Sequence, residues 1–263
     1  MSRDILQHCG PWAVVTGASS GIGRAFAFAL AERGFAVVLV ARRGDALAAV
    51  ADEIRSRHGS ATRVIAVDLG EAGAAAAVIE QCAELDVGML VAAAGFGSVG
   101  PLLERELADE ANMVDVNCRA VLELTHAFGR RLVARGRGAI VLLSSVVAFQ
   151  GAPRSANYAA TKAYVQSLAE GLRLELAPRG VRVVACAPGP VESEFAARAG
   201  MRDGSAARPE VVANETLRRL TRATVRPGGL AKLLGWSLSL LPRAGRVRVM
   251  AKIMVGMARG ASA

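Results

Sequence analysis

Short apolar runs alternate along the chain with longer stretches in which apolar residues recur every three or four positions. The short runs have the length of buried strands, and the periodic stretches have the spacing of amphipathic helices. Strands are predicted over residues 13–16, 35–41, 63–67, 89–94, 139–143 and 181–187, with a short last strand at 223–226. Helices are predicted over 24–33, 45–57, 71–85, 107–134, 156–176 and 209–222. This alternation predicts an α/β fold with a three-layer, doubly wound parallel sheet.

Composition favours one domain spanning residues 1–263, with a core over 10–227 and a C-terminal helical extension over 228–263. The N-terminus has no apolar signal segment, and no run reaches the roughly 18 apolar residues of a membrane span. We therefore expect a cytoplasmic protein. The four cysteines and the scattered histidines argue against a metal site, a disulfide framework or a histidine-based triad.

The first predicted strand runs directly into a glycine-rich turn that precedes a helix. After Thr16 the turn reads Gly17-Ala18-Ser19-Ser20-Gly21-Ile22-Gly23, a T-G-x-x-x-G-x-G spacing. Glycines let the backbone turn tightly and approach a pyrophosphate, and the free N–H groups of a helix N-terminus attract its charge. Because the turn stands between a strand and a helix, it predicts a dinucleotide site.

Two arginines follow the second predicted strand. Arg42 and Arg43 come after Ala41, which stands where an acidic residue would bind the ribose hydroxyls of NAD. A guanidinium at this place can bind the 2′-phosphate of NADP. We therefore predict NADP as the cofactor and regard NAD as the weaker candidate. The alternative is that both arginines only solvate the end of a strand.

Tyr158 and Lys162 lie four residues apart in the helix predicted over 156–176, a spacing that places both side chains on one face. A nearby ammonium favours the phenolate and can lower a phenol pKa of about 10 by roughly 1 to 3 units, as a general acid or base requires. The chain uses arginine for nearly all its cations, so a lysine here indicates a site that needs a compact charge. The alternative is a chance pair on a helix surface.

Positive charge is concentrated at the C-terminal end. The net charge is +9, yet residues 1–215 carry 22 cations against 23 acids, and after Glu215 there are ten cations and no acid. This distribution argues against a nucleic-acid-binding body and indicates an anionic partner of the extension. Three interpretations remain open. They are a peripheral membrane contact through Trp236, nearby leucines and arginines; docking of an acyl carrier or coenzyme A; and a helical pair that packs on a neighbouring subunit or covers the site.

Motifs over residues 12–195 together resemble one known family. They are Thr16 to Gly23, Asp68-Leu69, Gly95, Asn117, Ser145, Tyr158, Lys162 and Pro188-Gly189. This set resembles the short-chain dehydrogenase/reductase superfamily. The segments ARRGDAL and VRPGG resemble its branch of steroid and long-chain 3-ketoacyl reductases. The resemblance implies a Rossmann-type sheet of about seven parallel strands, a nicotinamide cofactor, hydride transfer between a carbonyl and an alcohol, and a homodimer or homotetramer.

The resemblance also implies residue roles. Tyr158 matches the proton donor, Lys162 the residue that binds the nicotinamide ribose and tunes the phenol, and Asn117 the residue that fixes a water in the proton relay. Ser145, rather than Ser144, matches the serine that hydrogen-bonds the substrate carbonyl. The predicted cofactor contacts are Gly17, Ser19, Ser20, Gly21, Ile22, Gly23, Arg42, Arg43, Asp68, Leu69, Ala94, Gly95, Tyr158, Lys162, Pro188, Gly189, Val191 and Ser193.

Two segments depart from the family pattern. Ala92-Ala93-Ala94-Gly95 stands where N-N-A-G is usual, so two amides that stabilise the sheet are absent, although backbone contact with the cofactor can survive. Ser193 stands where a threonine is usual near the carboxamide, which is a mild change.

The expected substrate is a hydrophobic ketone such as a 3-oxoacyl chain. Leu102, Leu103, Phe149, Phe195 and Met201 are expected to line its pocket, and residues 191–208 to form a flap over it. We thus predict an NADPH-dependent reductase that uses Tyr158 as proton donor. The alternatives are an NAD(P)-binding sensor or scaffold without turnover and NAD-dependent alcohol oxidation. The intact Ser-Tyr-Lys set argues against the first, and Arg42 argues against the second.

Overall fold

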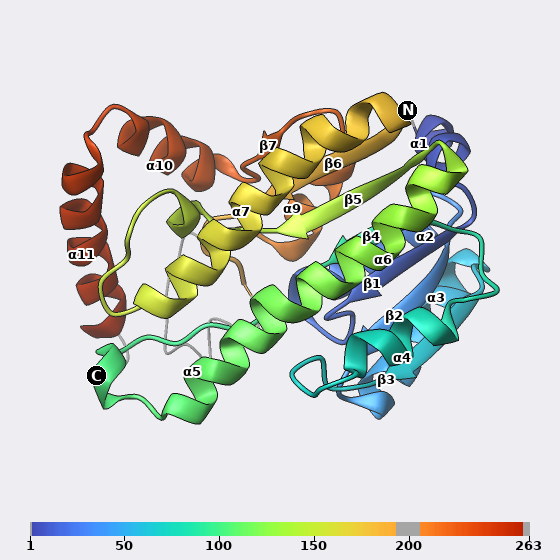
Figure 1. Cartoon of the computed structure of the whole chain (residues 1–263), viewed down its shortest axis with the longest axis horizontal. Coiled ribbons are helices and arrows are strands. Elements are labelled where there is room, and N and C mark those ends of the chain that lie inside the picture. The colour runs from blue at the N-terminus through green and yellow to red at the C-terminus, as the bar shows by residue number, and fades with distance from the viewer. Residues whose placement is uncertain (1, 193–205, 260–263) are drawn as a thin grey trace.

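A computed structural model describes residues 2–192 and 206–259, and in this part of the chain seven parallel strands form one central sheet (Figure 1). The strands are β1 (Trp12–Thr16), β2 (Ala36–Ala41), β3 (Thr62–Ala66), β4 (Val87–Ala92), β5 (Gly138–Leu143), β6 (Val181–Cys186) and β7 (Thr224–Val225). Their order is β3-β2-β1-β4-β5-β6-β7, so the direction in which strands are added reverses between β1 and β4. The predicted doubly wound parallel sheet is confirmed.

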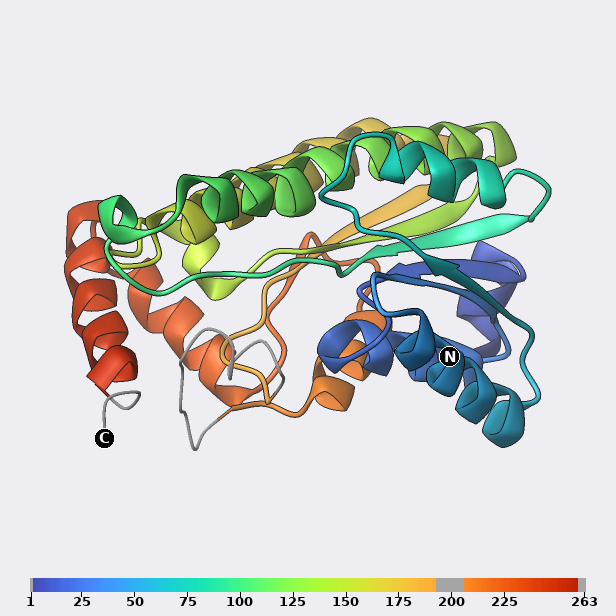
Figure 2. The same cartoon turned by 90° about the horizontal axis from the view of Figure 1, so that it is seen from below.

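Helices cover both faces of this sheet, as Figure 2 shows. They are α2 (Gly21–Ala31), α3 (Gly44–His58) and α9 (Pro209–Leu217) on one face, and α4 (Ala74–Gln81), α6 (Ala120–Arg135) and α7 (Ala156–Leu176) on the other. Neighbouring residues of a strand point to opposite faces. Val15 therefore joins the apolar cluster beneath α2 and α3, whereas Val14 joins the cluster beneath α4 and α6.

The helix predicted over residues 107–134 is interrupted at Asn117. The structure has α5 (Leu107–Val114), a π-helical turn η2 (Asp115–Arg119) and then α6. A single π-helical turn inside an α-helix is frequent at functional sites. Here it surrounds Asn117, which is fully buried.

Some elements differ from the pattern prediction. An unpredicted helix, α1 (Ser2–Cys9), packs Ile5 and Cys9 into the core, but eight residues are too few to show a helical period. Helix α4 starts later than expected because Gly73 before it has a left-handed φ of 78°. Single 3-10 turns occur at η1 (Leu102–Glu104), η3 (Val146–Phe149) and η4 (Ala177–Arg179).

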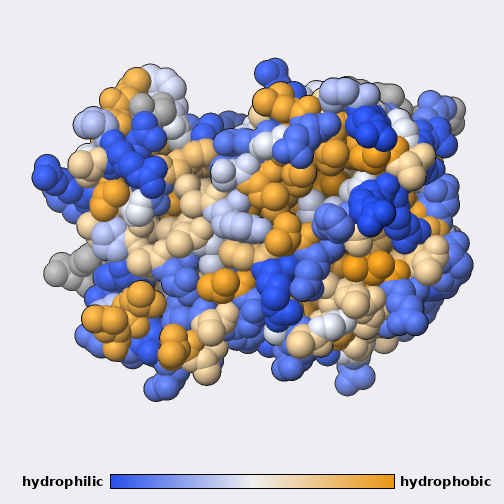
Figure 3. Space-filling model, in the orientation of Figure 1, coloured by the Kyte–Doolittle hydropathy of each residue, from blue (hydrophilic) through white to orange (hydrophobic). Residues whose placement is uncertain are grey.

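The C-terminal extension forms two helices, α10 (Gly229–Ser239) and α11 (Arg243–Arg259), at one end of the molecule. Their inner residues form a separate apolar cluster with residues from η3 and the start of α7. Figure 3 shows apolar and hydrophilic side chains next to one another over the corner between α10 and α11. Among the described residues, neither of these helices nor any other is both long enough and apolar enough to cross a membrane.

Candidate active site

A cavity of about 690 Å³ lies at the carboxyl ends of the strands, where the strand order reverses. In parallel sheets, ligands bind at this edge. The lining includes every described residue that the sequence predicts as a cofactor contact, and Ser145 as well. These are Gly17, Ser19, Ser20, Gly21, Ile22, Gly23, Arg42, Arg43, Asp68, Leu69, Ala94, Gly95, Ser145, Tyr158, Lys162, Pro188, Gly189 and Val191. Ser193 lies outside the described residues.

The glycine turn fits closely between β1 and the start of α2. A Cβ atom at Gly23 would lie 2.2 Å from the carbonyl oxygen of Gly17, so a side chain there would push the turn out of place. The Thr16 hydroxyl accepts a hydrogen bond of 2.9 Å from the Ala94 N–H, which ties the turn to the end of β4. Ser20 makes no side-chain cap on α2. The first N–H groups of α2 are therefore available to an anion.

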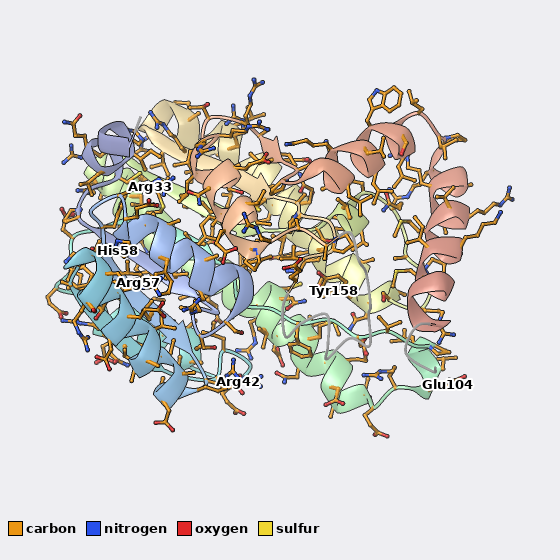
Figure 4. The ribbon with its side chains drawn as sticks, turned by 180° about the vertical axis from the view of Figure 1, so that it is seen from behind. Arg33, Arg42, Arg57, His58, Glu104 and Tyr158 are labelled. Carbon is orange, nitrogen blue, oxygen red and sulfur yellow. The ribbon has the colours of Figure 1, made fainter. Side chains whose placement is uncertain are left out.

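Positive charge lies at the end of the cavity near β2 and β3. Arg42 Nη1 lies 3.4 Å from Asp68 Oδ2, and Arg43 Nη2 donates a 3.5 Å hydrogen bond to Ser19 Oγ. The Arg42 side chain is 55% exposed, so its guanidinium can turn toward a ligand. Figure 4 shows Arg42 near the surface of the molecule and Tyr158 farther inside. Together with the N-terminus of α2, these cations suit a dinucleotide that carries an additional phosphate.

Lys162 lies below Tyr158 on the same face of α7, as its spacing predicts. Its Nζ is 5.8 Å from the centre of the Tyr158 ring and donates a 2.8 Å hydrogen bond to the carbonyl oxygen of Leu143. Burial lowers the pKa of Lys162 to about 8. An amine in this position can therefore gain and lose a proton near neutral pH.

The expected lowering of the phenol pKa is not found. Burial raises the pKa of Tyr158 to about 12, and a hydrogen bond with the Ser145 side chain opposes this shift only in part. Lys162 does not offset this effect of burial, because it directs its hydrogen bond to the Leu143 carbonyl and lies near the ring rather than at the hydroxyl. Tyr158 is therefore a protonated phenol at neutral pH and has a proton to donate.

The polar residues near Tyr158 and Lys162 have defined hydrogen-bond partners. Asn117 does not line the cavity. Its Oδ1 accepts from the Phe96 N–H at 3.1 Å, and its Nδ2 donates to the Phe96 carbonyl at 2.9 Å and to Thr161 Oγ1 at 3.0 Å. A Cβ atom at Gly95 would lie 2.8 Å from Asn117 Oδ1 and 3.3 Å from Lys162 Nζ, so both polar groups converge on this glycine. Ser144, by contrast, donates to the backbone carbonyl of Lys162 at 3.2 Å.

The far end of the cavity is apolar, but its lining differs from the prediction. Leu102 and Leu103 are 47% and 97% exposed and do not reach the cavity, because they belong to the surface turn η1. Phe149 packs beneath Arg226, with 4.4 Å between the guanidinium carbon and the ring centre. Phe195, Met201 and most of the predicted flap lie outside the described residues. The apolar lining comes from Val99, Val147, Leu234, Leu238, Met250, Ile253 and Met254.

The inner faces of α10 and α11 therefore cover the cavity, as one interpretation of the basic extension proposed. Their contribution could not be predicted, because nothing in the local sequence distinguishes methionines that line a cavity from core methionines. Ser98 and Ser155 also line the cavity and were not predicted. Ser98 follows β4 at the carboxyl edge of the sheet, and this location could have predicted it as a site residue.

Two curated relatives cover about two thirds of the chain. The first is a 7beta-hydroxysteroid dehydrogenase of Clostridium sardiniense, 37% identical over 68% of this chain and 69% of its own length. The second is a very-long-chain 3-oxoacyl-CoA reductase of Podospora anserina, 37% identical over 66% of this chain and 53% of its own length. The chain thus spans about half of that second protein. Both names fall in the branch that the sequence motifs indicated.

Two solved structures share the fold over most of the chain. One is of a 7beta-hydroxysteroid dehydrogenase, with a TM-score of 0.87 and 26% identity, covering 94% of this chain and 98% of that one. The other is a short-chain dehydrogenase from Sphingobium yanoikuyae in complex with NADPH, with a TM-score of 0.80 and 31% identity, covering 88% and 93%. The sequence profile of the short chain dehydrogenases matches residues 11–203. The chain therefore belongs to the short-chain dehydrogenase/reductase family of oxidoreductases.

Proposed function

We propose that the protein uses NADPH to reduce a hydrophobic ketone, such as a 3-oxoacyl substrate, to an alcohol. The observation that carries this proposal is one continuous cavity. It joins a glycine turn and two arginines at one end to Ser145, Tyr158 and Lys162, and then to an apolar wall. A relative solved in complex with NADPH supports the choice of cofactor.

The lining residues fit this cofactor. The glycine turn and the start of α2 would hold the pyrophosphate, Arg42 and Arg43 the 2′-phosphate, and Asp68 with Leu69 the adenine. Tyr158 and Lys162 would hold the nicotinamide ribose, and the backbone of Pro188, Gly189 and Val191 the nicotinamide. When bound, NADPH supplies the hydride.

In the proposed mechanism, Ser145 and Tyr158 donate hydrogen bonds to the carbonyl oxygen of the substrate and polarise it. Tyr158 then gives its proton to that oxygen, which its raised pKa allows because the phenol stays protonated at neutral pH. The ammonium of Lys162 stabilises the phenolate that remains. Asn117 lies beside Lys162 across Gly95, and we assign it the water that returns a proton to this pair.

The substrate end of the cavity supports an apolar substrate. The described cations that line the cavity are Arg42, Arg43 and Lys162, and all three belong to the cofactor contacts. A small anionic substrate would have to lose its hydration without gaining a positive partner at the α10–α11 wall, which is costly. Relatives named for a hydroxysteroid and for a very-long-chain 3-oxoacyl thioester support the same substrate class.

We further propose that the protein is a homo-oligomer. Leu122 on α6 and Tyr164 and Leu174 on α7 are 45%, 38% and 77% exposed. Burial of such side chains against a second copy would remove them from water. Sedimentation velocity measures this directly, and a monomer at micromolar concentration would contradict it.

The outer surface of the extension supports contact with an anionic membrane. Leu233 and Trp236 on α10 and Leu240 directly after it are 59%, 66% and 68% exposed and form one stripe opposite the residues that line the cavity. On α11, Arg248 and Lys252 are exposed, four residues apart, and have no ion pair among the described residues. Apolar side chains beside unpaired cations suit the interface of a bilayer with anionic lipids.

Replacing Tyr158 by Phe tests the reaction. We expect NADPH oxidation with a hydrophobic ketone to slow by about 10²- to 10⁴-fold, because the general acid is lost. NADPH binding, measured by fluorescence titration, should stay close to wild type. Tyr164→Phe, on the same helix, is the matched control and should keep full activity. Near-normal turnover by the Tyr158→Phe variant would exclude Tyr158 as proton donor.

Replacing Arg42 by Gln tests the cofactor. The wild type should oxidise NADPH in preference to NADH. The variant should lose roughly 10- to 100-fold in kcat/KM for NADPH, which corresponds to one hydrogen bond from a charged group, and change little with NADH. Arg57→Gln on α3 removes the same charge away from the cavity and is the control. An equal loss with both cofactors would contradict a contact with the 2′-phosphate.

The buried amine of Lys162 should appear in the pH dependence of stability. Its folded pKa of about 8 lies below the ordinary lysine pKa of 10.5, so between these pH values the unfolded chain holds a proton that the folded chain has released. The free energy of unfolding should therefore rise with pH in this window, by about 1 kcal/mol per pH unit. Above pH 10 the raised pKa of Tyr158 opposes this rise.

Urea unfolding from pH 7 to 10 measures this effect as the difference between wild type and Lys162→Met. The exposed Lys252→Met variant is the control and should follow the wild type. If the Lys162→Met and wild-type curves are parallel, the amine is not titrating in this range.

Neutralising two cations on α11 tests the membrane contact. The Arg248→Gln/Lys252→Gln variant should bind vesicles of phosphatidylglycerol and phosphatidylcholine roughly 10- to 30-fold more weakly than wild type, at about 1 kcal/mol per cation. Vesicles of phosphatidylcholine alone should not bind either protein. Arg218→Gln/Arg222→Gln, outside the extension, is the matched control. Equal co-sedimentation of all three proteins, or none with any, would remove the membrane proposal.

A further inference from the structure

A buried carboxylate lies behind the substrate end of the cavity. Glu110, in the first turn of α5, has a side chain that is 6% exposed. Its Oε1 accepts a 2.6 Å hydrogen bond from Ser98 Oγ, and its Oε2 accepts one of 2.8 Å from Asn157 Nδ2. Arg105 Nε is 3.7 Å from Oε1. A buried carboxylate is costly unless such partners compensate it, so these contacts hold three segments of the chain together.

Two further hydrogen bonds join the same segments. Ser155 Oγ donates to the Ser98 carbonyl at 2.9 Å, and the Gly100 N–H donates to the Arg154 carbonyl at 2.8 Å. In the part of the chain that the structure describes, Arg154 is the one residue other than glycine with a positive φ, 67°. This conformation is strained for a residue with a side chain and persists where the surroundings require it. The loop after β4 is thus fixed to the start of α7.

Both serines of this network line the cavity, and Asn157 directly precedes Tyr158 in α7. Val99, next to Ser98, packs in the same apolar cluster as Tyr158. The contact between α5 and α7, on the side of the molecule where α5 is labelled in Figure 1, therefore sets the wall beside the proposed proton donor.

The hydroxyl protons of both serines are already used. A serine hydroxyl has one proton to donate and two lone pairs that accept. Ser98 gives its proton to Glu110, and Ser155 gives its proton to the Ser98 carbonyl. Toward a ligand in the cavity, these two hydroxyls can only accept hydrogen bonds. The cavity lining also includes the aliphatic and methionine side chains of Val99, Val147, Leu234, Leu238, Met250 and Met254, together with Phe96 and Glu192.

We propose that Glu110 determines specificity by fixing Ser98 as a hydrogen-bond acceptor, and that the substrate is a hydrophobic ketone that also carries a hydroxyl group. This inference rests on the proposed carbonyl reduction and narrows its substrate class. Glu110 acts through Ser98 and does not touch the reacting atoms. Its role is to select ligands that donate a hydrogen bond to this wall over ligands that only accept one.

The Glu110→Gln variant should reverse the direction of the hydrogen bond between Ser98 and residue 110. Asn157 Nδ2 also donates to the backbone carbonyl of residue 110 at 2.9 Å, which fixes its orientation. It can therefore pair only with the oxygen of the new side-chain amide, so the amide nitrogen faces Ser98 and donates to its oxygen. The Ser98 proton then becomes free to point into the cavity. The shape and burial of the side chain at position 110 barely change, whereas the preferred ligand group at Ser98 changes from a hydrogen-bond donor to an acceptor.

The experiment uses sets of cyclic ketones that differ in one group: a hydroxyl, the corresponding methyl ether, or hydrogen. For at least one position of this group, wild type should favour the hydroxy ketone over the ether by roughly 3- to 10-fold in kcat/KM, as expected for one hydrogen bond. Glu110→Gln should remove or reverse this ratio and leave the unsubstituted ketone and NADPH binding nearly unchanged. Glu104→Gln, with an exposed carboxylate on η1, is the matched control and should keep the wild-type ratio.

Equilibrium binding of the same ketones in the presence of NADP⁺, where no reduction takes place, separates the two proposals. If no ketone is reduced but the wild-type binding ratio is present and Glu110→Gln alters it, the reductase proposal and the substrate class fail, while the role of Glu110 in selecting hydrogen-bond donors stands. A wild type that does not distinguish hydroxyl from ether at any position overturns the inference. An equal loss with all three ketones in Glu110→Gln also overturns it, because the carboxylate would then serve only the fold.

Discussion

The site depends on one constraint: the strands of a parallel sheet all end at the same edge. Chain segments far apart in sequence meet there because β1 and β4 are neighbours in the sheet although two strands lie between them in the chain. The bond between Thr16 and Ala94 crosses this junction. It also shows how the loop after β4 is held in a chain that has alanines at 92 and 93, where the family usually has two amides.

Burial, more than pairwise charge, governs the electrostatics of the site. Tyr158 and Lys162 are one helical turn apart, yet their pKa values move in opposite directions from the ordinary range, each toward its neutral form. Removal from water disfavours phenolate and ammonium alike. At neutral pH the pair therefore consists of a neutral phenol and an amine that is still mostly protonated.

The local patterns of the sequence predicted most of the fold and many of the residues that line the cavity. The strand at 139–143 and the helix at 156–176 could be read directly, because a buried strand and an amphipathic helix each have a period visible within a few residues. Glycines and arginines at the strand ends were also informative. Their roles follow from backbone geometry and charge at the carboxyl edge of the sheet, which the predicted strands locate.

The substrate end could not be predicted in the same way. Leu102 and Leu103 are as apolar as Leu234 and Leu238, but the first pair is exposed and the second lines the cavity. The tertiary packing of η1 and α10 decides which of these leucines line the cavity. The local sequence pattern does not predict this packing. The prediction of a lowered phenol pKa failed for a related reason, because the Lys162 amine on α7 donates its hydrogen bond to the Leu143 carbonyl at the end of β5.

The α10–α11 wall has its own apolar cluster, separate from the two clusters that hold the helices to the sheet. Substitutions at Met250 or Met254 therefore reshape the substrate end with little effect on the packing of β1 to β6. Flexible methionine side chains adapt readily to neighbours of different size. During evolution, the residues of this small cluster can thus change faster than the residues at the nucleotide end. New substrates can then be accepted while the nucleotide end stays constant.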